Sequence, residues 1–68
     1  MENVVIKVGG MSCQGCVKNV TRALSGTAGV ANVDVSLEAG EARVSYDPAK
    51  VSANALRAVI EDAGFDAA

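Results

Sequence analysis

Residues 4–24 read VVIKVGGMSCQGCVKNVTRAL, and their apolar pattern changes once along the way. The first apolar residues alternate with their neighbours, whereas the later ones recur at the three- and four-residue spacing of an α-helix. The alternating residues are Val4, Ile6 and Val8, and the helical ones are Val17, Val20 and Leu24. The change predicts a strand followed by a helix over about residues 14–25, with Ser12 or Cys13 as its N-cap and Gly26 as its stop.

The rest of the chain continues with two strands, a helix and a last strand. Alternating residues predict strands over about residues 32–37 and 41–46, joined by a turn in which Gly40 is available for a positive φ. A second helix is expected to begin near Ser52 and to close at Gly64. Its apolar stripe is expected to contain Ala55, Leu56, Val59, Ile60 and Ala63. Phe65 and Ala67 are expected to form a short last strand.

The order strand, helix, strand, strand, helix, strand predicts an α+β fold of the ferredoxin-like βαββαβ type. Such a sandwich has a four-stranded antiparallel sheet with two helices on one face. No linker or low-complexity segment interrupts the chain, so residues 1–68 are expected to form a single domain. Half of the residues are apolar but only two are aromatic. This composition favours close layers of aliphatic side chains over a roomy substrate pocket, and therefore argues against an enzyme.

Charge and hydropathy exclude two classes of partner. The formal net charge is −2 and the basic residues are scattered, so no patch for a nucleic acid is expected. The apolar run at residues 4–6 is too short for a signal sequence or a membrane span, so we expect a cytoplasmic protein with no membrane insertion. In a reducing compartment, two cysteines at CxxC spacing indicate metal or redox chemistry rather than a structural disulfide.

Cys13 and Cys16 are the only cysteines, and the chain has no histidine. A helix N-terminus stabilises a thiolate through its partial positive charge and its free N–H groups. Structural zinc normally takes four protein ligands and catalytic zinc three, whereas soft thiolates select Cu(I). We therefore predict that both cysteines are metal ligands for one Cu(I) per monomer. Ag(I) and Hg(II) are expected to bind as well, and Zn(II) would need ligands from solvent or from a second molecule.

Four further residues near these cysteines each have two interpretations. Met11 offers a soft sulfur, but a lone methionine more often fills an irregular gap in a core. Phe65 can close the core, pack against the cysteine loop and keep water from the second thiol, or do both. Lys18 and Arg22, one turn apart, are typical of a solvated helix face, and would otherwise form the basic part of a docking surface beside the metal.

Residues 10–16, GMSCQGC, resemble the GM(T/S)CxxC loop of the heavy-metal-associated domain family. The resemblance covers nearly the whole chain and continues at residues 29–30, 33–35, 37–40, 44–47 and 60–65. It is greatest to the bacterial copper chaperones of the CopZ type. It implies a ferredoxin-like fold, Cu(I) held by Cys13 and Cys16, and exchange of Cu(I) with the N-terminal metal-binding domain of a copper-transporting P-type ATPase. It also implies that Cys13 meets the partner thiolate first, through a three-coordinate bridge, while Cys16 is the more buried holder.

Two residues depart from the pattern of those chaperones. Gly15 stands where many of them have His, and Phe65 stands where they often have Tyr and where the ATPase domains commonly have Phe. An N-terminal domain of a copper ATPase is therefore an alternative, although the Met1 start and the compact length favour a free metallochaperone. The apo protein is expected to be a monomer, and an exposed two-ligand site would allow a copper-bridged dimer through four thiolates.

Three other functions share the CxxC pattern. A mercury-binding carrier would have the same loop and fold. A thiol-disulfide oxidoreductase is disfavoured because the chain is short and has no Trp beside its cysteines. A zinc-sensing or zinc-delivery module is disfavoured by Ser12, which stands where a carboxylate would help to bind a harder ion.

Overall fold

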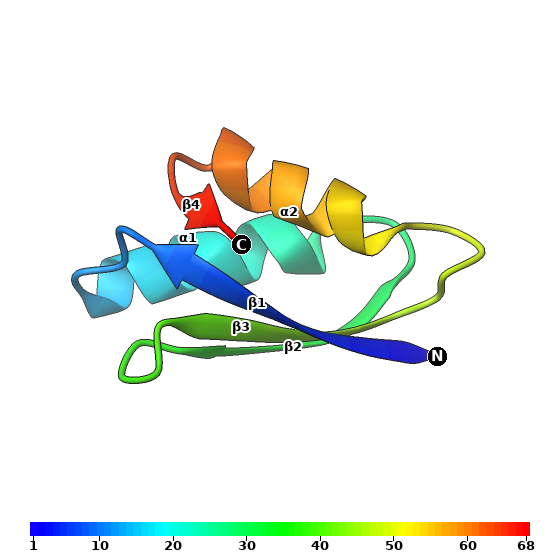
Figure 1. Ribbon diagram of the computed structural model, residues 1–68, viewed down its shortest axis with the longest axis horizontal. Coiled ribbons are helices and arrows are strands. Elements are labelled where there is room, and N and C mark those ends of the chain that lie inside the picture. The colour runs from blue at the N-terminus through cyan, green and yellow to red at the C-terminus, as the bar shows by residue number, and fades with distance from the viewer.

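Six elements follow one another in the predicted order in a computed structural model that describes residues 1–68. They are β1 (Glu2–Gly9), α1 (Gln14–Ser25), β2 (Val30–Ser36), β3 (Glu41–Tyr46), α2 (Ala53–Asp62) and β4 (Asp66–Ala67). The strands form one sheet in the order β2-β3-β1-β4, and every neighbouring pair is antiparallel. Both helices cover the same face of this sheet (Figure 1), so the predicted ferredoxin-like βαββαβ sandwich is confirmed. Neither helix is long and apolar enough to cross a membrane.

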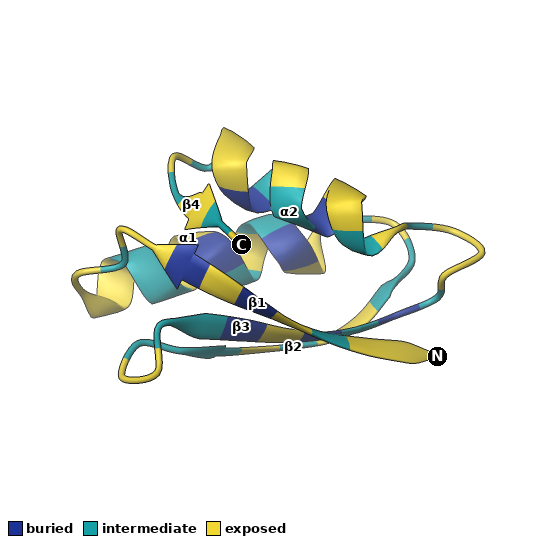
Figure 2. Cartoon of the chain, in the orientation of Figure 1, coloured by how far each residue is buried: buried dark blue, intermediate teal, exposed yellow.

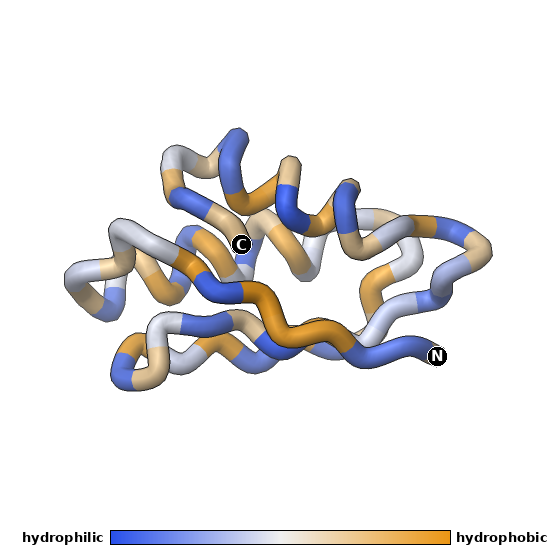
Figure 3. Tube along the Cα trace, in the orientation of Figure 1, coloured by the Kyte–Doolittle hydropathy of each residue, from blue (hydrophilic) through white to orange (hydrophobic).

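The core lies between the sheet and the two helices, and it is mostly aliphatic, as the composition predicts. Its nine buried residues are Ile6, Val8, Val20, Leu24, Ala42, Val44, Tyr46, Leu56 and Ile60. In Figure 2 the buried segments of α2 lie on the side of the helix that faces the sheet. Hydrophobic residues recur along β1 and both helices in Figure 3, in keeping with the two spacings read from the sequence. The core therefore links β1 and α1 through one shared cluster, in which α1 lies against β2 and α2.

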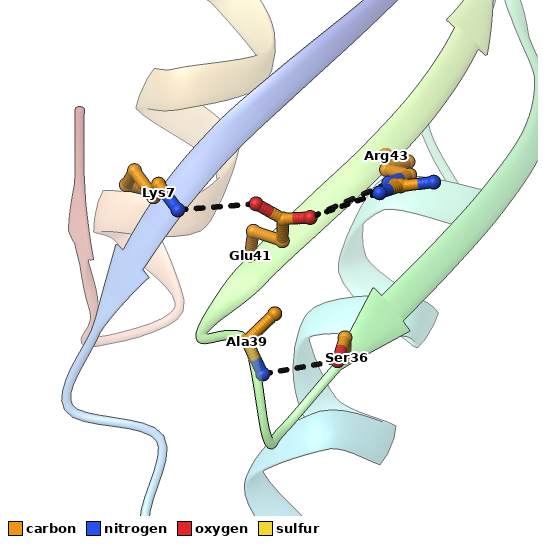
Figure 4. Close-up of polar contacts among 5 residues, drawn as sticks. All are labelled: Lys7, Ser36, Ala39, Glu41 and Arg43. Carbon is orange, nitrogen blue, oxygen red and sulfur yellow. Dashed lines mark hydrogen bonds and ion pairs between the residues drawn. The ribbon is translucent and has the colours of Figure 1, made fainter.

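The opposite face of the sheet has no helix over it and carries polar side chains. The Glu41 carboxylate lies 3.1 Å from the Lys7 ammonium and 3.3 Å from the Arg43 guanidinium (Figure 4). The hydrogen bond that Lys7 donates is the main cause of the lowered pKa of Glu41, and Arg43 adds a smaller effect of the same sign. In the adjoining turn, the Ala39 N–H donates to Ser36 Oγ at 3.1 Å. Gly40 has a φ of +64°, as predicted for this turn.

The start of β2 and the stop of α1 differ from the prediction. Strand β2 begins at Val30 rather than near residue 32, and its register against β3 shifts between Val30 and Asn32. This irregularity breaks the alternation of side chains, which hid the first residues of the strand. Gly26 does follow α1, but in a right-handed conformation with φ of −79°, and the left-handed residue is Gly29.

The second helix and the last strand differ in two details. Ala55, which was expected in the apolar stripe, is exposed. It precedes Leu56 by about 100° around the helix, which turns it away from the face that Leu56 and Ile60 bury. Strand β4 begins at Asp66, because the Phe65 N–H donates to the Ile60 carbonyl at 3.3 Å and so belongs to the helix end.

Candidate metal centre

The segment between β1 and α1 places the two cysteines at one end of the molecule. In Figure 1 this segment lies at the same end of the long axis as the β2–β3 turn and the α2–β4 turn. Cys13, rather than Ser12, is the N-cap of α1, with an extended backbone (φ −158°, ψ 170°). Its carbonyl accepts hydrogen bonds from the N–H groups of Cys16 at 3.1 Å and Val17 at 3.3 Å. Its side chain makes no capping hydrogen bond, so the thiol is left free for other chemistry.

The two predicted ligands lie together. Both cysteines are free thiols, Cys13 exposed and Cys16 partly buried, and their sulfur atoms are 3.5 Å apart. With metal–sulfur bonds of about 2.3 Å, as in zinc thiolates, this separation corresponds to an S–metal–S angle of about 100°. A planar three-coordinate ion would need a separation of about 4.0 Å and a linear one about 4.6 Å, on the same bond length. The sulfurs therefore have to move apart by roughly 1 Å to hold an ion linearly, and by less to hold it with a third ligand.

The surroundings of Cys16 favour its thiolate form. The backbone amide of Ser12 is the main cause that lowers the pKa of the Cys16 thiol below its ordinary value. The Cys13 side chain lowers the pKa further, and desolvation opposes both. Thiolates rather than thiols bind soft metal ions, so a lowered pKa makes Cys16 available as a ligand at a lower pH.

Met11 and Phe65 are both partly buried and pack against the core. For Met11 this is the core-packing interpretation of the sequence. Phe65 also reaches the cysteine segment, because its Cδ1 atom lies 3.6 Å from the position of a Cβ built on Gly10. Phe65 therefore closes the core and also contacts the cysteine segment, and its shielding of the Cys16 thiol from water stays a prediction.

No His, Asp or Glu side chain joins the two thiols as a third metal ligand, because no group of three Cys, His, Asp or Glu residues is close enough to share an ion. Lys18 and Arg22 are exposed on α1.

Two features of the site were not predicted from the sequence: the Ser12 amide that acts on Cys16, and the closeness of residue 15 to the Cys13 sulfur. A Cβ on Gly15 would lie 3.6 Å from that sulfur. The sequence shows neither feature. Every residue but proline has a backbone N–H, so the role of the Ser12 amide has no sequence pattern, and glycine has no side chain that would indicate a contact at position 15.

Comparison with known proteins gives consistent matches along the chain. A family model described as the heavy-metal-associated domain matches residues 5–66. The chain is 47% identical over 68 residues to the copper chaperone CopZ of Bacillus subtilis (strain 168), covering 100% of this chain and 99% of that protein. It is 41% identical over 63 residues to the copper-transporting ATPase 2 of Rattus norvegicus, covering 93% of this chain and 4% of that protein.

The fold is also similar to those of solved structures. A copper binding domain from HMA7, a P-type ATPase, superposes with a TM-score of 0.99 at 37% sequence identity. That match covers 100% of this chain and 92% of the other. Strong similarity therefore extends both to a free chaperone and to a domain within a larger ATPase.

Proposed function

This chain belongs to the heavy-metal-associated domain family, and on that premise we propose that it carries Cu(I) on the thiolates of Cys13 and Cys16. The observation that carries the proposal is the pair of free sulfurs 3.5 Å apart at the start of α1. Domains of this family and the copper chaperones related to it carry metals and do not catalyse reactions, so the chain is not an enzyme, as the sequence predicted. A thiol-disulfide oxidoreductase is accordingly set aside.

The donor set explains the choice of Cu(I). Two soft thiolates match a soft monovalent ion that needs few ligands, and no His, Asp or Glu side chain joins them. Ag(I) and Hg(II) share this preference and would bind in vitro. Zn(II) would bind more weakly, because its usual tetrahedral shell would need two ligands from outside the chain. We expect one Cu(I) per monomer.

Exchange of Cu(I) with the N-terminal metal-binding domain of a copper-transporting P-type ATPase is the second part of the proposal. It is supported by the similarity of this chain to such ATPases and by the unequal exposure of the two cysteines. The exposed Cys13 would meet the incoming thiolate, and the partly buried Cys16 would hold the ion until last. The exposed Lys18 and Arg22 on α1 would form the basic part of the docking surface.

In the cell, this activity would be that of a cytoplasmic metallochaperone in copper homeostasis, built as a single domain over residues 1–68. The apo protein would be a monomer, and Cu(I) could bridge two copies through four thiolates because Cys13 is exposed. A domain of a larger copper ATPase would use the same site, and the similarity to the rat ATPase keeps this second candidate open.

An anaerobic titration of the reduced protein with Cu(I), against a competing chromophoric chelator, tests the site. Native mass spectrometry would count the ions bound. We expect one Cu(I) per monomer, lost in both Cys13→Ser and Cys16→Ser and retained in Gln14→Ala, which changes an exposed residue between the two cysteines. Binding that survives either cysteine substitution would overturn the proposal.

Transfer is tested separately. Cu(I)-loaded protein would be mixed with the apo metal-binding domain of the copper ATPase from the same organism, separated, and assayed for copper. Transfer faster than release to a chelator would support the chaperone function, and transfer no faster than that release would contradict it. Induction of the gene by mercury but not by copper would instead identify a mercury carrier.

A further inference from the structure

Position 15 lies beside the sulfur of Cys13. A Cβ built on Gly15 would be 3.6 Å from Cys13 Sγ, which is ordinary van der Waals contact. The first atom of any side chain at this position would therefore touch the sulfur. Glycine has no such atoms, and Cys13 is already the exposed member of the pair.

Cys16 is the less exposed of the two cysteines. Each sulfur has the other at 3.5 Å, Cys16 is partly buried, and the Phe65 ring packs beside Gly10 in the same segment. A new ligand can reach the sulfur pair most directly over the exposed Cys13. Because Gly15 has no side chain, no side-chain atom of that residue obstructs this approach.

We infer that Gly15 is a specificity-determining position: the missing side chain lets a bulky thiolate, such as a cysteine held in another folded protein, reach an ion bound at Cys13. The resting separation of the sulfurs, 3.5 Å, is nearer to the value of about 4.0 Å for a planar three-coordinate ion than to about 4.6 Å for a linear one. A third thiolate can thus enter with little movement of the pair, provided that nothing stands over Cys13. The inference rests on the proposed function for the identity of the incoming ligand, but not for the accessibility of the sulfur.

In the exchange itself, the incoming thiolate donates an electron pair to Cu(I) and forms a new Cu–S bond. The Cu–S bond to one resident cysteine then breaks, and that cysteine leaves as a thiolate or takes up the proton that the incoming thiol has lost. The copper stays monovalent, so no oxidant or reductant is needed. A side chain at position 15 would hinder the formation of the first bond.

The test measures access without copper. In a Cys16→Ser background, Cys13 is the only thiol, and its alkylation rate is measured with iodoacetamide and with the bulkier N-phenylmaleimide. The measured quantity is the alkylation rate with N-phenylmaleimide divided by the rate with iodoacetamide. Both rates are measured at the same pH, so a change in the thiol pKa alters them equally and cancels in the ratio. Gly15→Ala and Gly15→Val form the series, and Gln14→Val is the matched control on the neighbouring exposed residue.

We expect the ratio to fall by about five- to tenfold in Gly15→Val, less in Gly15→Ala, and less than about twofold in Gln14→Val. With Cys16 restored, Gly15→Val should pass Cu(I) to a protein-bound thiol several-fold more slowly, by more than any change in its Cu(I) affinity accounts for. An unchanged reagent ratio in both Gly15 variants would overturn the inference. Failure of the proposed function is a separate outcome: the unmodified protein would not bind Cu(I) in the titration, whatever the alkylation ratio.

Discussion

The ring of Phe65 packs over Gly10, with its Cδ1 atom 3.6 Å from where a Cβ on that glycine would stand. The contact joins the end of α2 to the segment that carries the cysteines, although the two residues are far apart in the sequence. Gly10 has a φ of +92°, so a side chain there would be strained as well as crowded. The aromatic ring therefore contacts both the core and the segment that carries the cysteines.

Replacing Phe65 by alanine should loosen the cysteine segment. Because the ring is only partly buried, we expect the free energy of unfolding to fall by about 2 kcal/mol, below the range for a fully buried phenylalanine. Urea denaturation of the apo protein measures this loss, and amide hydrogen exchange at residues 10–12 should speed up. Phe65→Leu, which keeps most of the volume, is the control and should lose less. Unchanged exchange at residues 10–12 in Phe65→Ala would show that the ring does not order the segment.

The two helices are capped differently, and the difference can be measured. Ser52 Oγ accepts a hydrogen bond from the Ala55 N–H at 3.1 Å, whereas Cys13 makes no such bond at the start of α1. Ser52→Ala should therefore cost about 1 kcal/mol of unfolding free energy, and Cys13→Ser should increase it by about 0.5–1 kcal/mol. Denaturation of the metal-free, reduced proteins checks both values. A loss of stability in Cys13→Ser would mean that the cysteine supports the fold in a way that no hydrogen bond here explains.

Two glycines with positive φ should respond differently to alanine. Gly29 has a φ of +92°, and a Cβ there would meet Lys50 Cβ at 2.8 Å and Val51 Cγ1 at 3.0 Å. Gly64 has a φ of +97° and nothing within 4 Å. Gly29→Ala should therefore cost about 2–4 kcal/mol, the sum of backbone strain and crowding. Gly64→Ala should cost only the strain, about 1–2 kcal/mol, and equal losses in the two variants would contradict this account.

The pKa of Cys16 gives a prediction for pH dependence. In a Cys13→Ala variant, where Cys16 is the only thiol, the thiolate absorbance should titrate at a lower pH in the folded protein than in urea. The Ser12 backbone amide, the main cause of the lowered pKa, is still present in this variant. A pKa lowered by folding means that the thiolate stabilises the folded state. This contribution is complete above the pKa of the unfolded chain and is lost as the pH falls through the pKa of the folded one.

The matching stability measurement uses Cys13→Ala, with Cys13→Ala/Cys16→Ser as its control. The unfolding free energy of the single-thiol protein should rise with pH between the two pKa values of Cys16 relative to that of the control. Parallel curves for the two proteins would mean that the Ser12 amide does not act on the thiol.

Much of the fold could be predicted because local patterns and long-range packing agree. The alternation in residues 4–8 and the helical spacing in residues 17–24 reflect which side chains meet the core, so the order of elements follows from the sequence. The bulge near Val30 is an exception: it shifts the side-chain alternation, and only pairing with β3 reveals that the strand has begun. Ala55 is another, because spacing alone does not say how wide a face the sheet covers.

In the candidate metal centre, too, some features follow from the sequence and others only from the tertiary structure. By itself, the sequence identified the candidate donors, because Cys13 and Cys16 are the only cysteines and the chain has no histidine. Tertiary structure decided the distance between the sulfurs, the exposure of each cysteine, the Phe65 contact and the closeness of residue 15 to the Cys13 sulfur. The residue types show which metal-binding groups the chain contains. Distances and access depend on backbone dihedrals at the helix start and on side chains brought in from the other end of the chain, and no local pattern records them.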